Sequence, residues 1–86
     1  MAYNIVYKQS IRRDLKKLPK ADAARILDQI EAELAKKPDM YPVLKGQFAG
    51  LRKFRIDDYC VIYAILEKDV VILRIGHRRE VYTGKI

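Results

Sequence analysis

The 86-residue sequence contains few of the residues that build disulfides, metal centres or phosphate-binding loops. One cysteine, Cys60, excludes an internal disulfide, and one histidine leaves a metal site without its usual ligands. The four glycines are scattered, so there is no glycine-rich loop for nucleotide phosphates. We therefore expect neither a metal nor a cofactor.

Long apolar segments are also missing. The longest uninterrupted apolar run, Tyr59–Leu66, has the length of a strand and is far shorter than the roughly 20 residues that a membrane-spanning helix needs. No short apolar segment follows a basic N-terminus, as it does in a secretory signal. We expect a cytoplasmic protein that makes no membrane contact.

Acidic residues are the minority among the charged ones. Eighteen Lys and Arg against eleven Asp and Glu give a net charge of +7. Such an excess on a short chain favours a polyanionic partner, most often nucleic acid, although it also keeps a small protein soluble. The length predicts one domain over residues 1–86 with a thin core, which fits a protein with a folding partner.

The hydrophobic pattern of the first half predicts a strand followed by two helices. Residues 2–7 alternate as a short strand, and Ser10 offers a cap for the helix that follows. A second apolar stripe with helical spacing runs from residue 23 to residue 34 and ends before Pro38. The two helices should form an antiparallel hairpin that packs on a sheet.

The second half of the chain changes to the period of strands after a loop over residues 39–50. Residues 51–56, 59–66 and 70–75 form three predicted strands whose tight turns make them antiparallel, and residues 77–82 are a candidate further strand. The predicted class is α+β, in the order β-α-α-β-β-β. It consists of a small twisted antiparallel sheet with the helix hairpin on one face and the other face left for function.

Two basic groups are candidates for binding phosphate. Lys53 and Arg55 lie two residues apart in a predicted strand, so both leave the same face of the sheet. Arg78, Arg79 and Tyr82 follow the last of these strands; arginine matches phosphate oxygens in two contacts, and tyrosine stacks on a base or moves a proton. If the two groups converge, their repulsion calls for an anion between them. The alternatives are a solvated strand face and a frayed basic C-terminus.

Cys60 lies inside the most apolar strand. A lone thiol in such a place is most often a packing residue, and a nucleophilic pair with His77 is the alternative that the residues leave open.

Four stretches in order resemble the RelE/ParE toxin superfamily, on its RelE side. They are Leu44–Gly46 (LKG), Arg52–Ile56 (RKFRI), Asp58–Tyr63 (DYCVIY) and Gly76–Tyr82 (GHRREVY), and the similarity covers nearly the whole chain. The resemblance implies the toxin of a type II toxin–antitoxin pair with a small antiparallel sheet and two N-terminal helices. It also implies an endoribonuclease that enters the ribosomal A site and cuts mRNA without a metal, by attack of the ribose 2′-hydroxyl on the adjacent phosphate.

The resemblance also implies roles for individual residues. Lys53 is the candidate for abstracting the 2′ proton, Arg55 grips the phosphate, Arg78 meets the developing phosphorane, and Tyr82 matches the late tyrosine of catalysis or base stacking. Further implied RNA contacts are Lys45, Arg52, Arg74, His77 and Arg79.

The chain departs from the superfamily at Cys60, where the resemblance implies a catalytic arginine. A protonated thiol does not hold a phosphate, so we expect weaker cleavage than in the Cys60→Arg variant, whether the cysteine is natural or an inactivating change. We also expect position 60 to open into the same pocket as the basic residues.

The implied partner is an acidic, partly disordered antitoxin of the RelB type, which folds on the toxin and supplies any contact with DNA. The ribosome and mRNA are the other implied partners. The same fold leaves an alternative open, a ParE-type toxin that binds and inhibits DNA gyrase without nuclease chemistry. A basic α+β domain with neither activity is the third possibility.

Overall fold

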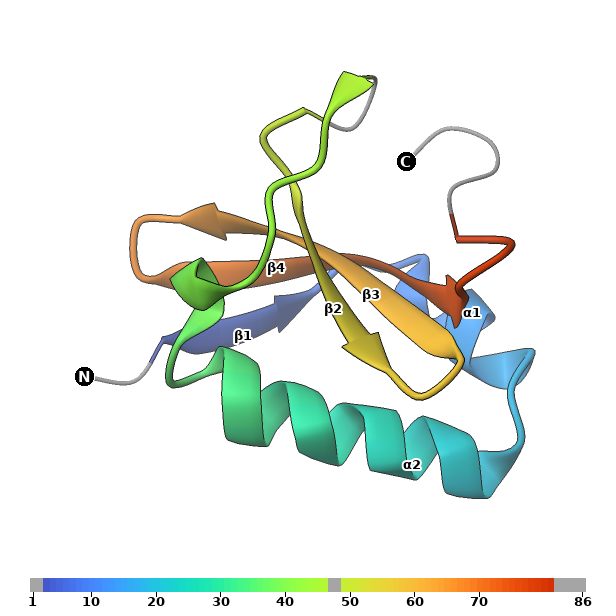
Figure 1. Ribbon diagram of the computed structural model, residues 1–86. Coiled ribbons are helices and arrows are strands. Elements are labelled where there is room, and N and C mark those ends of the chain that lie inside the picture. Colours follow the sequence, from blue (N-terminus) through green and yellow to red (C-terminus); the bar gives the residue numbers. More distant parts are fainter. Residues whose placement is uncertain (1–2, 47–48, 82–86) are drawn as a thin grey trace.

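The computed structural model describes residues 3–46 and 49–81 of the chain. Its strands form a sheet in the order β1-β4-β3-β2, and helices cover one face of this sheet (Figure 1). The elements are β1 (Asn4–Tyr7), α1 (Ile11–Lys16), α2 (Lys20–Gln29), a π-helical turn η1 (Ile30–Leu34), a 3₁₀ turn η2 (Pro38–Met40), β2 (Arg52–Ile56), β3 (Tyr59–Leu66) and β4 (Asp69–His77). This arrangement confirms the predicted α+β class and element order.

The pairing of β1 differs from the all-antiparallel sheet that we expected. β2, β3 and β4 form the predicted antiparallel meander, but β1 lies beside β4 and runs parallel to it, from Asn4 opposite Asp69 to Tyr7 opposite Ile72. The sheet is therefore mixed, with its first and last strands as neighbours. The helices that follow β1 carry the chain across the sheet, which is the type of connection that parallel pairing requires.

The ends of three predicted elements also differ in the structure. The Ser10 side chain makes no capping hydrogen bond to α1. β4 continues through Gly76 to His77, and residues 78–81 form a turn instead of a strand. Residue 82, which the predicted last strand included, lies outside the described residues.

The main core lies between the helices and the sheet. It is a cluster of buried side chains from both layers: Ile11, Ile26, Ile30, Leu34, Phe54, Ile56, Val61, Tyr63, Val70, Ile72 and Ile75. Burial of one such apolar side chain contributes about 1.5–3 kcal/mol. The alternation of strand residues then sends their neighbours to the opposite face, which we call the open face.

A carboxylate of α1 continues the hydrogen bonding of β4 beyond the end of β1. The pairing with β1 stops at Ile72, so farther along β4 the described residues place no strand on that side. There Asp14 Oδ2 accepts a hydrogen bond of 3.1 Å from the Ile75 amide. This bond ties α1 to the sheet and satisfies a donor that a partly buried strand must pair.

Within the described residues, no helix is long and apolar enough to cross a membrane.

Candidate phosphate-binding surface

The open face carries cations in rows that cross the sheet. The register places Lys53 of β2 opposite Ile62 of β3, and Ile62 opposite Arg74 of β4. The next row consists of Arg55, Cys60 and Gly76. Because directly opposed residues share a face, the positive side chains on this face include Lys53, Arg55 and Arg74. Phe54, between the first two, is buried against the helices, which confirms the predicted direction of this strand.

Two of these cations remain available to a ligand. Lys53 is half-buried and Arg55 is exposed, and neither forms an ion pair within residues 3–46 and 49–81. Arg55 is oriented by its own turn, since its Nε donates to the Asp57 carbonyl at 3.1 Å. This bond orients the guanidinium group and leaves its two Nη nitrogens to donate. Two parallel donors of this kind match the oxygens of a phosphate.

Cys60 lies on the open face but does not open into a pocket. The side chain is 4 % exposed and packs in a second, smaller cluster with Ile62 and Val81, flanked by Leu44 and Leu51. The prediction that the thiol shares a face with Arg55 is confirmed, and the prediction that it is accessible there is wrong. The reason is the turn after β4, which folds back so that Val81, itself 2 % exposed, covers the thiol.

Several hydrogen bonds fix this turn. The amides of Glu80 and Val81 donate to the His77 carbonyl at 2.8 and 2.9 Å. The Arg78 amide donates to the Asp58 carbonyl at 2.8 Å, which holds the exposed Arg78 beside the β2–β3 turn. This anchoring places Arg78 at the same end of the sheet as Arg55.

Arg74 stabilises the same turn. Its Nη1 donates to the Val81 carbonyl at 2.8 Å. The predicted RNA contact at Arg74 is therefore on the expected face, but its guanidinium already holds the backbone that covers Cys60.

The structure places two other predicted RNA contacts away from the open face. Arg52 shares the helix side with Phe54, and its Nη1 donates to the carbonyls of Asp39 at 3.1 Å and Tyr41 at 2.7 Å. His77 lies edge-on to Tyr59, with 6.0 Å between the ring centroids, and Tyr59 in turn reaches α2. These two positions correct the expectation for Arg52 and His77, because strand alternation turns both side chains to the helix side.

The remaining residues with a predicted role in RNA binding or catalysis are exposed or lie outside the described residues. Lys45 is exposed in the segment that rises on the side opposite α2 (Figure 1), next to Leu44 of the second cluster. Arg79 is exposed, and its amide donates to His77 Nδ1 at 3.4 Å. Tyr82 lies outside the described residues, so its role stays a prediction.

Arg52 belongs to a clamp that supports the loop before β2. Besides the two bonds of Arg52, the hydroxyl of the fully buried Tyr63 donates to the Pro38 carbonyl. Burial raises the pKa of the Tyr63 phenol well above its usual range, so the donor proton is retained. The clamp fixes the turn η2 from which the chain leaves towards Lys45.

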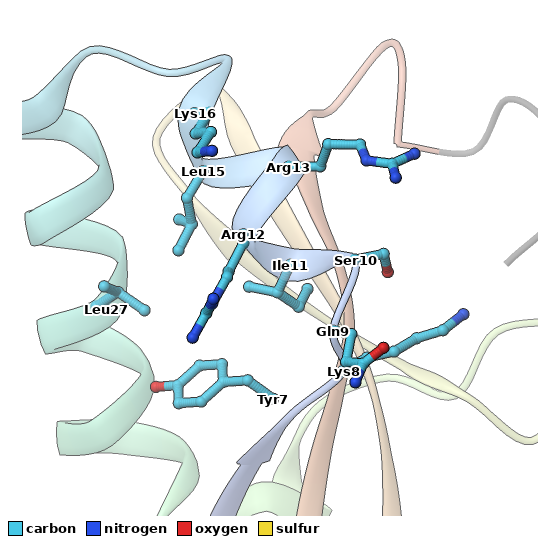
Figure 2. A pocket seen from close by; sticks show the side chains of 10 residues that line it. All are labelled: Tyr7, Lys8, Gln9, Ser10, Ile11, Arg12, Arg13, Leu15, Lys16 and Leu27. Atoms are coloured by element: carbon cyan, nitrogen blue, oxygen red, sulfur yellow. The ribbon is translucent and has the colours of Figure 1, made fainter.

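One basic region is not among the predicted sites, because the apolar stripe of α1 drew attention away from the cations around it. A hollow with a cavity volume of about 1140 Å³ lies between the end of β1, α1 and α2 (Figure 2). Its charged lining residues are Lys8, Arg12, Arg13 and Lys16. The signal was available in the sequence, because these four cations fall within nine residues.

No group of three or more His, Cys, Asp or Glu side chains in the described part of the chain lies close enough to hold a metal ion.

The helix pair on one face of a small sheet and the cationic opposite face define a small basic α+β protein, and comparison with known proteins identifies its family. Residues 5–82 match the family model described as the ParE toxin of type II toxin–antitoxin systems. The chain therefore belongs to this family, within the RelE/ParE superfamily, and is a toxin of a type II toxin–antitoxin system.

Relatives on the RelE side are similar as well. Toxin RelG of Mycobacterium tuberculosis is 32% identical over 85 residues, which is 95% of this chain and 98% of that protein. A RelBE toxin–antitoxin complex from the same organism contains a chain with a TM-score of 0.81 and 30% identity, covering 91% of this chain and 100% of that chain. A free mutant of E. coli toxin RelE has a TM-score of 0.77 at 19% identity, covering 96% and 93%, and this likeness shows the fold alone.

Proposed function

We propose that the chain is a ribosome-dependent endoribonuclease that cuts mRNA. The observation that carries this proposal is the pair Lys53 and Arg55, which the register sets on one open face without an ion-pairing partner among the described residues. Two unpaired cations on a shallow surface suit the sugar–phosphate backbone of a single RNA strand. The 30–32% identity to RelE-side relatives supports the same choice.

The reaction needs one bond to form and one to break. The ribose 2′-oxygen attacks the adjacent phosphorus, the P–O5′ bond breaks, and a cyclic phosphate and a 5′-hydroxyl result. In this proposal the neutral amine form of Lys53 faces the 2′-hydroxyl and takes up its proton, and water carries a proton from the resulting ammonium to the departing 5′-oxygen. Arg55 binds the non-bridging oxygens, and Arg78 meets the charge that develops on the phosphorane. Each aimed donor of this kind is worth about 10²–10³ in rate.

Dependence on the ribosome is part of this proposal, and the composition of the described open face supports it. The chain has one histidine, and His77 faces the helix side, so the groups at hand for proton transfer there are few. Cys60 adds no charge and is covered by Val81. We infer that the ribosome positions the message and completes the site, and that cleavage by this chain is weak.

We also propose an acidic antitoxin as the partner that silences the toxin. Similar chains are found in complexes with a second protein: the RelBE complex of Mycobacterium tuberculosis is named a toxin–antitoxin complex, and a RelE–RelB complex of Pyrococcus horikoshii contains a chain at 30% identity and a TM-score of 0.64. An acidic segment on the open face would neutralise Lys53 and Arg55 and exclude RNA. DNA would be contacted through the antitoxin.

The second candidate function is inhibition of DNA gyrase without cleavage. Two observations favour it. The matching family model describes the ParE toxin, and Cys60, at the centre of the open face, is uncharged and covered. Under this alternative the basic surface binds a partner and performs no chemistry.

Purified chain, ribosomes and a defined mRNA test the choice. We expect cleavage by the unaltered protein and a loss of about 10²–10³ in rate for Lys53→Ala or Arg55→Ala, with Lys37→Ala as the control because Lys37 is exposed and has no place in the proposed site. Cleavage that survives both substitutions contradicts the site. Absent cleavage together with inhibited DNA supercoiling supports the alternative.

A further inference from the structure

The segment from the end of β1 to the start of α2 concentrates positive charge on the helix-bearing side of the molecule. Residues 8–20 contain six Lys or Arg and a single acid, Asp14. The Asp14 carboxylate is occupied by the Ile75 amide. All six cations are exposed, so this segment accounts for much of the net charge and presents it to solvent.

Four of these cations belong to residues that line the hollow beside α1, and they define what we call the α1 surface: Lys8, Arg12, Arg13 and Lys16. None of the four has an ion-pairing partner within the described residues. Arg12 extends towards Tyr7 and α2, whereas Lys8 and Arg13 extend to the other side of α1 (Figure 2). Positive charge is thus available on both sides of a short helix.

The other groups around the hollow are suited to an anion rather than to an apolar partner. Gln9 and Ser10 add neutral donors to the rim. Burial raises the pKa of Tyr7, as does the nearby Glu31, the acid on the α2 side of the hollow, so the Tyr7 phenol stays protonated. Of the apolar lining residues, Ile11 is buried and Leu15 and Leu27 are largely covered by packing, so they offer little surface to the apolar face of a peptide.

We propose that the α1 surface binds the phosphate backbone of double-stranded RNA. The inference rests on the proposed function, which makes RNA the substrate of the open face on the opposite side of the sheet. A duplex presents two rows of phosphates, which suits cations on both sides of α1. Among the described residues that line the hollow, Tyr7 is the one aromatic side chain, so the stacking platform that favours single strands is small.

Binding to a short RNA duplex of roughly 16 base pairs at several salt concentrations tests this proposal, with fluorescence anisotropy as the readout. The test variant is Arg12→Gln with Lys16→Gln. The control is Lys36→Gln with Lys37→Gln, which removes the same charge from exposed positions away from α1. We expect the slope of log K against log salt to fall by about two for the test variant, about one for each lost phosphate contact, and to stay unchanged for the control.

A second variant, Lys8→Gln with Arg13→Gln, makes the test independent of one pair of substitutions. We expect the same change in slope, and unchanged melting temperatures for both variants because all four side chains are exposed. Equal loss of binding in the control overturns the proposal, since any lost charge would then have the same effect. A larger effect on a DNA duplex of the same sequence, or on a glutamate-rich peptide, overturns it as well.

Failure of this inference is distinguishable from failure of the proposed function. Lys53→Ala should keep the duplex binding of the unaltered protein and lose cleavage of mRNA on the ribosome. Duplex binding that depends on α1 in a protein without nuclease activity would support the α1 surface and reject the nuclease. Ribosomal cleavage by a protein whose duplex binding is unchanged by the α1 substitutions would support the nuclease and reject the α1 surface.

Discussion

We expect the substitution Cys60→Arg to lower the stability of the protein and to raise its cleavage activity. The thiol is 4 % exposed beneath Val81, and the register sets it between Arg55 and Gly76 at the centre of the open face. An arginine at this position has no room as the chain is packed. It must either strain the second cluster or push the C-terminal turn away and emerge among the cations.

Both routes lower the free energy of unfolding by a similar amount. Overpacking a well-filled site costs about 1–3 kcal/mol. Displacing Val81 loses about 1.5–3 kcal/mol of apolar burial, and with it the bond between Arg74 and the Val81 carbonyl. For a domain of this size, 1 kcal/mol corresponds to a shift of about 4–8 °C. We therefore expect the melting temperature of the isolated toxin to fall by at least about 4 °C.

Cleavage should move in the opposite direction. An emerging guanidinium would add an aimed donor beside Arg55, so we expect ribosome-dependent cleavage to rise by up to about 10²-fold. The matched control is Cys60→Met, which adds bulk without charge: its melting temperature should fall while its cleavage rate stays at the original level. Thermal denaturation followed by circular dichroism and a primer-extension assay of mRNA cuts measure the two quantities.

The expected loss of stability would be contradicted by a Cys60→Arg protein that melts at a higher temperature than the original. The expected rise in cleavage would be refuted by equal cleavage rates for the cysteine and arginine forms, because position 60 would then have no part in binding the phosphate. A rise in cleavage for Cys60→Met would show that loosening the turn, and not the charge, limits activity.

Two further predictions concern groups that stabilise the fold. Asp14→Ala should lower the free energy of unfolding by about 1–3 kcal/mol, because the Ile75 amide loses its acceptor, whereas Asp14→Asn keeps an acceptor oxygen; equal urea midpoints for the alanine variant and the original would contradict this. The raised pKa of Tyr63 means that, above about pH 10, the unfolded chain loses a proton that the folded chain keeps, so stability should fall with pH by up to about 1.4 kcal/mol per unit. The free energy of unfolding of Tyr63→Phe should fall less steeply with pH. Parallel curves of this free energy against pH for the variant and the original would exclude the effect.

Local periodicity was a reliable guide to the second half of the chain. The period of two placed Lys53 and Arg55 on the face opposite Phe54, and the structure agrees, because a side chain in a strand has only two directions. The same alternation put Arg52 with Phe54 on the helix side, while the family resemblance implied an RNA contact there. The structure follows the alternation, and Arg52 binds the carbonyls of Asp39 and Tyr41.

Long-range pairing could not be derived from the sequence. Nothing in the pattern of residues 2–7 specifies that β1 runs parallel to β4, since a period of two is the same for either direction. The cover over Cys60 was hidden for a similar reason: it depends on the turn at residues 78–81 folding back, which backbone hydrogen bonds and Arg74 arrange. The basic character of α1 was present in the sequence, but its exposure and lack of partners required coordinates.

The pairing of β1 with β4 has a consequence for how the protein is made. In the described sheet β1 has β4 as its sole neighbour, and their contacts join Asn4 to Asp69 across 65 positions of the chain. A nascent chain cannot close this sheet until residues 69–72 have been synthesised and released from the exit tunnel. β1 is therefore synthesised first among the strands but is the last to find its partner in the sheet.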